Sequence, residues 1–284
     1  MMKTGVVFEG GAFRTVFSCG VMDSFLDENI MPDYIIGVSA GAAYGTSYAA
    51  KQRGRDLSII MNYSHDKRYM GFRNMLNPKN RSFYSLDFAY NRVPNELVPF
   101  DYEEYARYTG EFKVVVTNVL TGKPEYLPFT VEDHKFKLLQ ATCALPLLFP
   151  FIYINDIPYL DGGLTDSIPY EKAFEDGCDK VVVVLTRQPG YKKTTSHSTK
   201  RITYLYRKYP ELVNVLLLRA ERYNASLDRL MQLENEGKVI VIRPTLTDGF
   251  GRLEKNFEKI QALYDDGFKK GSDIANEVKN FFLQ

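Results

Sequence analysis

The stretch Tyr34-Ile35-Ile36-Gly37-Val38-Ser39-Ala40-Gly41 is a short apolar run that ends in a serine between two glycines. Gly37 to Gly41 match the pattern G-x-S-x-G, and the residues after them, 42–52, are helix-prone. This is the strand, turn and helix context that a nucleophile elbow requires. The small neighbours permit a sharp turn that exposes the serine hydroxyl, and the helix start directs N–H groups toward a developing anion. Ser39 is therefore a candidate nucleophile; the alternative is a β-to-α turn that uses the serine as a helix cap.

The surrounding sequence alternates between strand-like and helix-like segments. Apolar runs at residues 4–8, 34–36, 112–119, 180–186 and 238–243 are separated by stretches with helical spacing. Such alternation predicts an α/β fold around a mostly parallel sheet. Residues 181–185 are continuously apolar, as expected of a central strand covered on both faces. Two late helices are expected, one at 202–233 with a break near Pro210 and one at 253–282.

Two irregular stretches interrupt this pattern. Residues 189–200 are rich in Thr, Ser and Lys and are expected to form a flexible loop or a boundary between a catalytic portion and a C-terminal extension. Residues 63–99 contain many Arg, Asn, Tyr and Phe residues. We expect this second stretch to form a lid or an insertion that faces the substrate.

A glycine turn, Glu9-Gly10-Gly11-Ala12-Phe13-Arg14, follows the first predicted strand and opens a helix predicted to run to Asn29. Backbone amides in such a turn can bind an oxyanion or a phosphate. The dinucleotide fingerprint G-x-G-x-x-G requires a third glycine that this stretch lacks, so a nucleotide cofactor is disfavoured.

Asp161-Gly162-Gly163 follows a strand-like segment at residues 157–160. An aspartate before two glycines is commonly a turn former. If it meets Ser39, however, its carboxylate can accept the serine proton directly, so that no histidine is needed. A carboxylate with a reference pKa of about 3.9 is a weak base at neutral pH, and Asp161 would therefore need burial or a strained contact.

These features resemble the patatin-like phospholipase family in four ordered places. They are the glycine turn Gly10 to Arg14, the elbow Gly37 to Gly41, the segment Ala141-Thr142-Cys143-Ala144-Leu145-Pro146-Leu147-Leu148-Phe149-Pro150, and Asp161-Gly162-Gly163. The resemblance covers roughly residues 5–175. A weaker likeness to a bacterial branch of the family continues through residues 237–244 and the following helix.

The resemblance implies a three-layer α/β/α sandwich with a mostly parallel central sheet. Residues 5–175 would form the catalytic domain, and residues 176–284 would complete or extend the same α/β unit. It also implies a serine acyl hydrolase that cleaves carboxylic esters of lipids through an acyl-enzyme intermediate.

Carried onto this sequence, the resemblance assigns Ser39 as nucleophile and Asp161 as proton acceptor. By the same resemblance, Gly10, Gly11 and Ala12 supply the oxyanion amides. Arg14 steadies this loop or attracts a phosphate headgroup. The motif glycines are Gly37, Gly41, Gly162 and Gly163. Three residues depart from the family pattern: Ala12 and Thr15 replace glycines, and Cys143 replaces a small hydroxyl residue. Alanine keeps its N–H but disfavours the positive φ that glycine adopts easily. Ala12 is therefore expected to affect the geometry of the oxyanion loop.

Two other functions remain open. One is an α/β-hydrolase triad in the order Ser39, Asp161, His197. His197 lies in the polar stretch with no strand end beside it, while His65 and His134 precede Asp161. The other is a lipid-binding relative without turnover, for which Ala12 and Thr15 are the best support.

Composition limits the partners. The sequence has 36 Lys and Arg against 35 Asp and Glu, which gives a net charge of +1. This balance does not indicate a nucleic acid as partner. Three cysteines without paired spacing indicate neither a disulfide framework nor a zinc site, which fits a reducing, cytoplasmic setting. Neither a metal nor another cofactor is expected.

The expected partner is a lipid or another acyl ester. The first residues alternate like a strand rather than a signal peptide. The longest nearly apolar run, at positions 144–154, is too short for a membrane helix, which needs roughly 20 residues. Contact with lipid is therefore expected to be peripheral, through the basic and aromatic residues of 63–99. Aromatic residues around Tyr84, Phe88 and Tyr90, or at 147–151, are candidates for lining an acyl pocket or touching a membrane surface.

Overall fold

The computed structural model describes residues 2–130, 132, 135–195, 199–245 and 247–284. Within the described residues, strands occupy all six places predicted from the sequence, residues 157–160 included, and two more. In the described residues they are β1 (Thr4–Phe8), β2 (Tyr34–Val38), β3 (Glu111–Asn118), β4 (Pro124–Pro128), β5 (Ile152–Ile154), β6 (Ile157–Asp161), β7 (Lys180–Val184) and β8 (Val239–Ile242).

Helices fill most of the intervals between the strands. The α-helices are α1 (Val16–Asp27), α2 (Ala40–Ala49), α3 (Arg55–Tyr63), α4 (Phe72–Met75), α5 (Tyr102–Ala106), α6 (Lys137–Thr142), α7 (Tyr170–Glu175), α8 (Thr199–Leu205), α9 (Pro210–Asn235), α10 (Phe257–Asp273) and α11 (Ala275–Leu283). Two 3₁₀ turns, η1 (Ala12–Thr15) and η3 (Gly162–Leu164), and a π-helical segment, η2 (Phe88–Leu97), complete the set.

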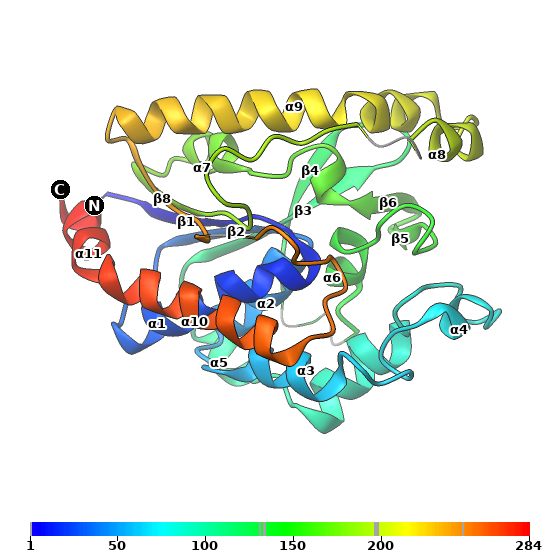
Figure 1. The fold of residues 1–284 in the computed structure, drawn as a ribbon, viewed down its shortest axis with the longest axis horizontal. Helices are drawn as coiled ribbons and strands as arrows, with labels where there is room; N and C mark the ends of the chain where they lie inside the picture. The colour runs from blue at the N-terminus through cyan, green and yellow to red at the C-terminus, as the bar shows by residue number, and fades with distance from the viewer. Residues whose placement is uncertain (1, 131, 133–134, 196–198, 246) are drawn as a thin grey trace.

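The strands form one mixed sheet in the order β5-β6-β3-β2-β1-β7-β8, with β4 paired to β3 outside this path. Neighbours from β3 to β8 along this order are parallel, whereas β4, β5 and β6 pair antiparallel. Helices α7 and α9 cover one face of the sheet, and α1, α2 and α10 lie on the other (Figure 1). The three-layer α/β/α fold with a mostly parallel sheet is thus confirmed.

Alternate side chains of the central strands enter two separate cores. Val6 of β1 packs in the core shared with α1, α2 and α10, and Val7 packs in the core shared with α7 and α9. Both valines are fully buried. Because successive strand side chains point to opposite faces, a strand covered on both sides must be apolar throughout, as the run at residues 181–185 is.

Strand β3 brings the ends of two other strands together. Val38, the last residue of β2, pairs with Val115, and Asp161, the last residue of β6, pairs with Val116. Strand β4 pairs with residues 113–117 and therefore occupies the other edge of β3. Strands β2 and β6 consequently lie end to end along one edge, so that Ser39 and Asp161 are neighbours despite their distance in sequence.

The late helices differ in detail from their predicted bounds. The segment predicted at 202–233 is interrupted before Pro210, where α9 begins, as expected of a residue that fits the first helical turn. The segment predicted at 253–282 is two helices rather than one, because the helical path breaks at Ile274 between α10 and α11.

Helix α10 packs against α1 with almost no side chain between the two backbones. A Cβ at Gly267 would lie 2.0 Å from the carbonyl oxygen of Phe17, and one at Gly20 would lie 2.1 Å from that of Tyr264. Only glycine allows this approach at either position. Tyr264 Oη also donates to Asp23 Oδ2 at 2.7 Å.

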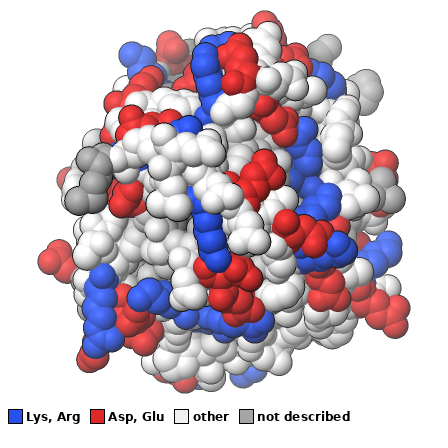
Figure 2. All heavy atoms as spheres, turned by 90° about the vertical axis from the view of Figure 1, so that its left-hand side faces the viewer, with Lys and Arg blue, Asp and Glu red and all other residues white. Residues whose placement is uncertain are grey.

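Charge on the outside is mixed. Figure 2 shows acidic and basic side chains interspersed over the side that carries the two termini, without a continuous basic area. Among the described residues, no helix combines the length and the apolar character needed to cross a membrane.

Candidate active site

Ser39 lies at the turn between β2 and α2, as the elbow predicts. Its backbone has φ 54 and ψ -129 in degrees. A residue with a side chain rarely adopts such a conformation, which costs on the order of 1–3 kcal/mol. Ser39 N donates to Thr142 Oγ1 at 2.8 Å, and Thr142 Oγ1 donates to Val115 O at 2.6 Å. Thr142 thereby holds the strained turn against β3, a role that the sequence analysis did not assign.

Asp161 is in direct contact with Ser39. Ser39 Oγ donates to Asp161 Oδ2 at 2.8 Å, and the N–H of Gly163 donates to Asp161 Oδ1 at 2.8 Å. The aspartate is only 2% exposed, and its own N–H donates to Ala144 O at 2.9 Å. Burial raises the pKa of Asp161 above its usual range, while the positive charge of Arg219 opposes the increase. The carboxylate is thus buried, as a base paired with Ser39 would require.

The glycine loop rests on the elbow. A Cβ at Gly10 would lie 2.7 Å from Val38 O and 2.8 Å from Ser39 Cβ, so only glycine lets the loop reach the serine. Ala12 adopts the positive φ that favours glycine and keeps its N–H. Gly10, Gly11, Ala12 and Arg14 all line the cavity that contains Ser39.

Two cavities meet at Ser39. A polar cavity of about 60 Å³ is lined by Ser39, Asp161 and the glycine loop, and an apolar cavity of about 200 Å³ lies on the other side of the serine. Both are lined by Ala12, Ser39, Leu145 and Arg252. The apolar cavity is enclosed mainly by aromatic and aliphatic side chains, among them Tyr44, Tyr84, Tyr90, Val93, Leu148 and Phe149.

Tyr84 and Tyr90 of the insertion at residues 63–99 line the apolar cavity. Phe88 instead packs with Ile59 and Val93 in a separate small core. Cys143 also lines the apolar cavity, and burial raises the pKa of its thiol to about 12.

His65 is the one histidine within the described residues, and it gives no support to a triad. The His65 ring lies 4.4 Å from the ring of Phe257, and within the described residues no histidine lines either cavity. His134 and His197 lie outside the described residues. In the part of the chain that the structure covers, no cluster of His, Cys, Asp and Glu is arranged to hold a metal ion.

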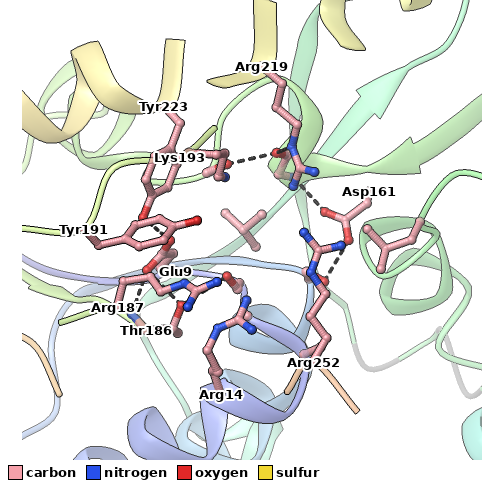
Figure 3. A pocket seen from close by; sticks show the side chains of 18 residues that line it. Glu9, Arg14, Asp161, Thr186, Arg187, Tyr191, Lys193, Arg219, Tyr223 and Arg252 are labelled. Carbon is pink, nitrogen blue, oxygen red and sulfur yellow. Dashed lines mark hydrogen bonds between the residues drawn. The ribbon is translucent and has the colours of Figure 1, made fainter. Parts of the chain in front are cut away.

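The polar cavity contains residues that sequence reasoning missed. Arg187, Lys193, Arg219 and Arg252 enter it from beyond the four motifs, beside Arg14 (Figure 3). Arg219 Nε donates to Gly163 O at 2.8 Å and so also supports the turn after Asp161. Lys193 comes from the stretch expected to be a flexible loop. No recognisable pattern surrounds these residues in the sequence, so nothing but the fold identifies them.

Two family models match the sequence. The model of the patatin-like phospholipases matches residues 6–174, well over half of the chain. The chain belongs to the patatin-like phospholipase family. A second model, a domain of unknown function (DUF6363), matches residues 209–283, which include Arg219 and Arg252.

The relatives of this patatin-like chain are distant. It is 25% identical to the uncharacterized protein YjjU of Escherichia coli over 65% of the chain and 52% of that protein. It is 22% identical to lysophospholipase NTE1 of Kluyveromyces lactis and 21% identical to that of Saccharomyces cerevisiae, over 97% and 94% of the chain. The chain spans about half the length of the bacterial relative and less than a fifth of these yeast relatives. Among solved structures, VipD from Legionella pneumophila aligns over 98% of the chain and 67% of its own, with a TM-score of 0.46 and 12% identity.

Proposed function

We propose that the protein is a lipid acyl hydrolase that uses Ser39 as nucleophile and Asp161 as proton acceptor. The observation that supports this best is the 2.8 Å hydrogen bond from Ser39 Oγ to the buried Asp161 carboxylate, at the junction of a polar and an apolar cavity. Family membership and the lysophospholipases among the relatives agree with this activity.

In the proposed mechanism the acyl chain occupies the apolar cavity and the ester carbonyl lies beside Ser39. Asp161 Oδ2 takes the proton as Ser39 Oγ attacks the carbonyl carbon, and the amides of Gly10 to Ala12 stabilise the negative charge on the carbonyl oxygen. The ester C–O bond then breaks, and the alcohol leaves with the proton held by Asp161. Water, deprotonated by Asp161, hydrolyses the acyl-enzyme, releases the fatty acid and restores the serine.

The broad test is a lipid panel with products identified by mass spectrometry. It should contain phospholipids, lysophospholipids, acylglycerols and a short soluble ester, each incubated with the wild type and with Ser39→Ala. Release of fatty acid by the wild type alone supports the proposal. Absence of product from every lipid, together with measurable lipid binding, would favour the non-catalytic lipid-binding alternative.

Activity should fall as the pH drops, because only the ionised Asp161 accepts a proton. Arg219 lowers the pKa of this carboxyl group, so Arg219→Gln should raise that pKa and move the acid limb of kcat/KM to higher pH, with a several-fold loss of activity on that limb. Arg219→Lys, which keeps the charge, should move the limb less. A pH profile with a soluble neutral ester measures both, and an unchanged limb in Arg219→Gln would contradict the assignment of Asp161 as the titrating base.

We also propose that α4 docks on an anionic lipid surface. Phe72 and Leu76 are 73% and 83% exposed, unusually high for large apolar side chains. Exposed basic residues lie near them in the sequence: Lys67, Arg68, Arg73, Lys79 and Arg81. Helix α4, the β5–β6 hairpin and α8 lie on the same side of the molecule (Figure 1), and each of these last two also exposes apolar side chains, Tyr153 and Leu205 among them.

Sedimentation with vesicles tests this docking. The wild type should bind anionic vesicles, less so at high salt because each basic residue contributes about 1 kcal/mol through a screened attraction. Phe72→Ser with Leu76→Ser should reduce binding about 10-fold or more, since two large apolar contacts are lost. Leu283→Ser is the matched control, because Leu283 is 82% exposed on α11, away from α4. Equal binding by the double variant would exclude α4 as the docking element.

A further inference from the structure

The polar cavity beside Ser39 concentrates positive charge. Arg14 enters it from η1, Arg219 from α9, Arg187 and Lys193 from the segment after β7, and Arg252 from the loop before α10 (Figure 3). Only two acidic residues of the described chain, Glu9 and Asp161, line the same cavity. The outer surface in Figure 2 has no comparable excess of one sign.

The five basic groups differ in exposure: Arg14 is buried, Arg187, Lys193 and Arg219 are partly buried, and Arg252 is exposed. Arg14 is only 7% exposed, and its Nε has no hydrogen-bond partner among the described residues. Burial, and then the charges of Arg187 and Arg252, lower the pKa of Arg14 to about 10. Burial, and then the charge of Arg219, lower the pKa of Lys193 to about 7. Holding cations away from water with too few counter-ions is costly, so this arrangement favours an anion.

The two acidic residues offset only part of the positive charge, acting on Arg14, Lys193 and Arg219. Glu9 Oε2 accepts hydrogen bonds from the N–H of Thr186 at 2.6 Å and from its hydroxyl at 2.9 Å, while Glu9 Oε1 accepts one from Tyr223 Oη at 2.8 Å. Asp161 is occupied by Ser39 and Gly163. Two carboxylates thus face five basic side chains in this cavity, and an excess of positive charge remains available for a ligand.

Two aromatic rings of the cavity are already in contact with basic side chains of the protein itself. Lys193 Nζ lies 3.6 Å from the centre of the Tyr223 ring, and the Arg187 guanidinium carbon lies 4.2 Å from that of Tyr191. A quaternary ammonium group would need such ring faces for recognition. The ring faces of Tyr191 and Tyr223 are occupied and the surrounding charge is positive. The cavity therefore disfavours a choline or ethanolamine headgroup.

We propose that this cavity binds the terminal phosphate monoester of an acyl-ester substrate, so that acylglycerol phosphates are preferred over their choline esters and over neutral acylglycerols. The proposal rests on the hydrolase function above. The cavity volume is about 60 Å³. Such a space holds a few water molecules, and a phosphate group fits it. With the phosphate there and the acyl chain in the apolar cavity, the ester between them lies at Ser39. Hydrolysis then yields a fatty acid and glycerol phosphate.

The first measurement is kcat/KM of the wild type for oleoyl glycerol phosphate, oleoyl glycerophosphocholine and oleoylglycerol. We expect the phosphate monoester to be preferred by about 10-fold or more, the effect of one or two charge-assisted hydrogen bonds. A preference for the choline ester or for the neutral lipid would overturn the proposal.

The second measurement determines kcat/KM of Lys193→Met for the same three substrates. We expect kcat/KM to fall about 10-fold or more for the phosphate monoester and less than about 2-fold for oleoylglycerol, because only the first loses an ion pair. Lys192→Met is the matched control, since the ammonium of Lys192 is paired with Asp228. It should leave all three values unchanged. An equal loss for all substrates in Lys193→Met would mean a structural role and contradict the proposal.

Titration calorimetry separates failure of the site from failure of the hydrolase function. The wild type should bind glycerol 3-phosphate, and Lys193→Met should bind it about 10-fold more weakly, whether or not any ester is cleaved. Absence of binding and of preference rejects the phosphate site. Binding without any hydrolysis rejects the hydrolase function alone. Tighter binding of inorganic phosphate than of glycerol 3-phosphate, with no lipid preference, would identify a site for free phosphate and overturn the substrate assignment.

The pH dependence of sulfate binding adds a further check, because the charge of sulfate does not change near neutral pH. Lys193 faces Arg219, Arg252, Glu9 and Asp161, and burial together with the charge of Arg219 lowers its pKa to about 7. Sulfate should therefore bind more weakly as the pH rises through 7 in the wild type. Lys193→Met should remove this dependence, and its persistence would contradict the role of Lys193.

Discussion

Replacement of Ser39 by alanine is expected to lower ester hydrolysis by about 10⁴-fold or more, the usual cost of losing a catalytic nucleophile. The reason is geometric, since Ser39 Oγ is the group that donates to the buried Asp161 and faces both cavities. Turnover of a soluble ester and covalent labelling by a fluorophosphonate probe measure the loss. Both signals should disappear together.

Ser58→Ala provides the control for this result. Ser58 lies on α3, where its hydroxyl contacts only Asn62 among the described hydrogen-bond partners, and it lines neither cavity. Its removal should leave labelling and turnover unchanged. Equal labelling of the wild type and of Ser39→Ala would exclude Ser39 as the nucleophile.

Asp161→Asn should reduce turnover by about 10⁴-fold while the protein stays folded. An amide has nearly the same shape as the carboxylate but cannot accept the serine proton. The Gly163 N–H can still donate to the amide oxygen, so the turn after β6 should survive. Because a carboxylate whose pKa is raised by burial is removed, the thermal midpoint should stay equal to that of the wild type or rise.

Circular dichroism, thermal unfolding and turnover must be measured on the same preparation of Asp161→Asn. Full activity in a folded variant would require another base. A large loss of activity in His197→Ala would then revive the triad of Ser39, Asp161 and His197.

The sequence identifies the parts of the site that depend on local backbone shape. The elbow at Ser39 and the glycine loop at Gly10 each need small residues at fixed spacing, because neighbouring backbones approach too closely for a Cβ. Such a requirement leaves a pattern in the sequence. Asp161 is recognisable for the same reason, since it directly precedes a glycine turn.

The remainder of the site depends on tertiary placement. Thr142 acts through β3, and Arg219 reaches the cavity only because α9 crosses the sheet face above it. A single basic residue on a long helix resembles any solvent-exposed arginine when the partner elements are unknown. Likewise, Lys193 lies in a polar stretch whose composition is typical of a loop, and only the fold shows that its ammonium is over a buried tyrosine ring.

The contact between α1 and α10 has a consequence for biosynthesis. Tyr264 of α10 follows its partner Asp23 of α1 by 241 residues, and the two backbones approach too closely for a Cβ at Gly20 or Gly267. During translation α1 therefore emerges long before its partner α10. Native contacts of such long sequence separation slow folding. A nascent chain that already contains Ser39 therefore cannot cover α1 with α10 until residues up to Asp273 have left the ribosome.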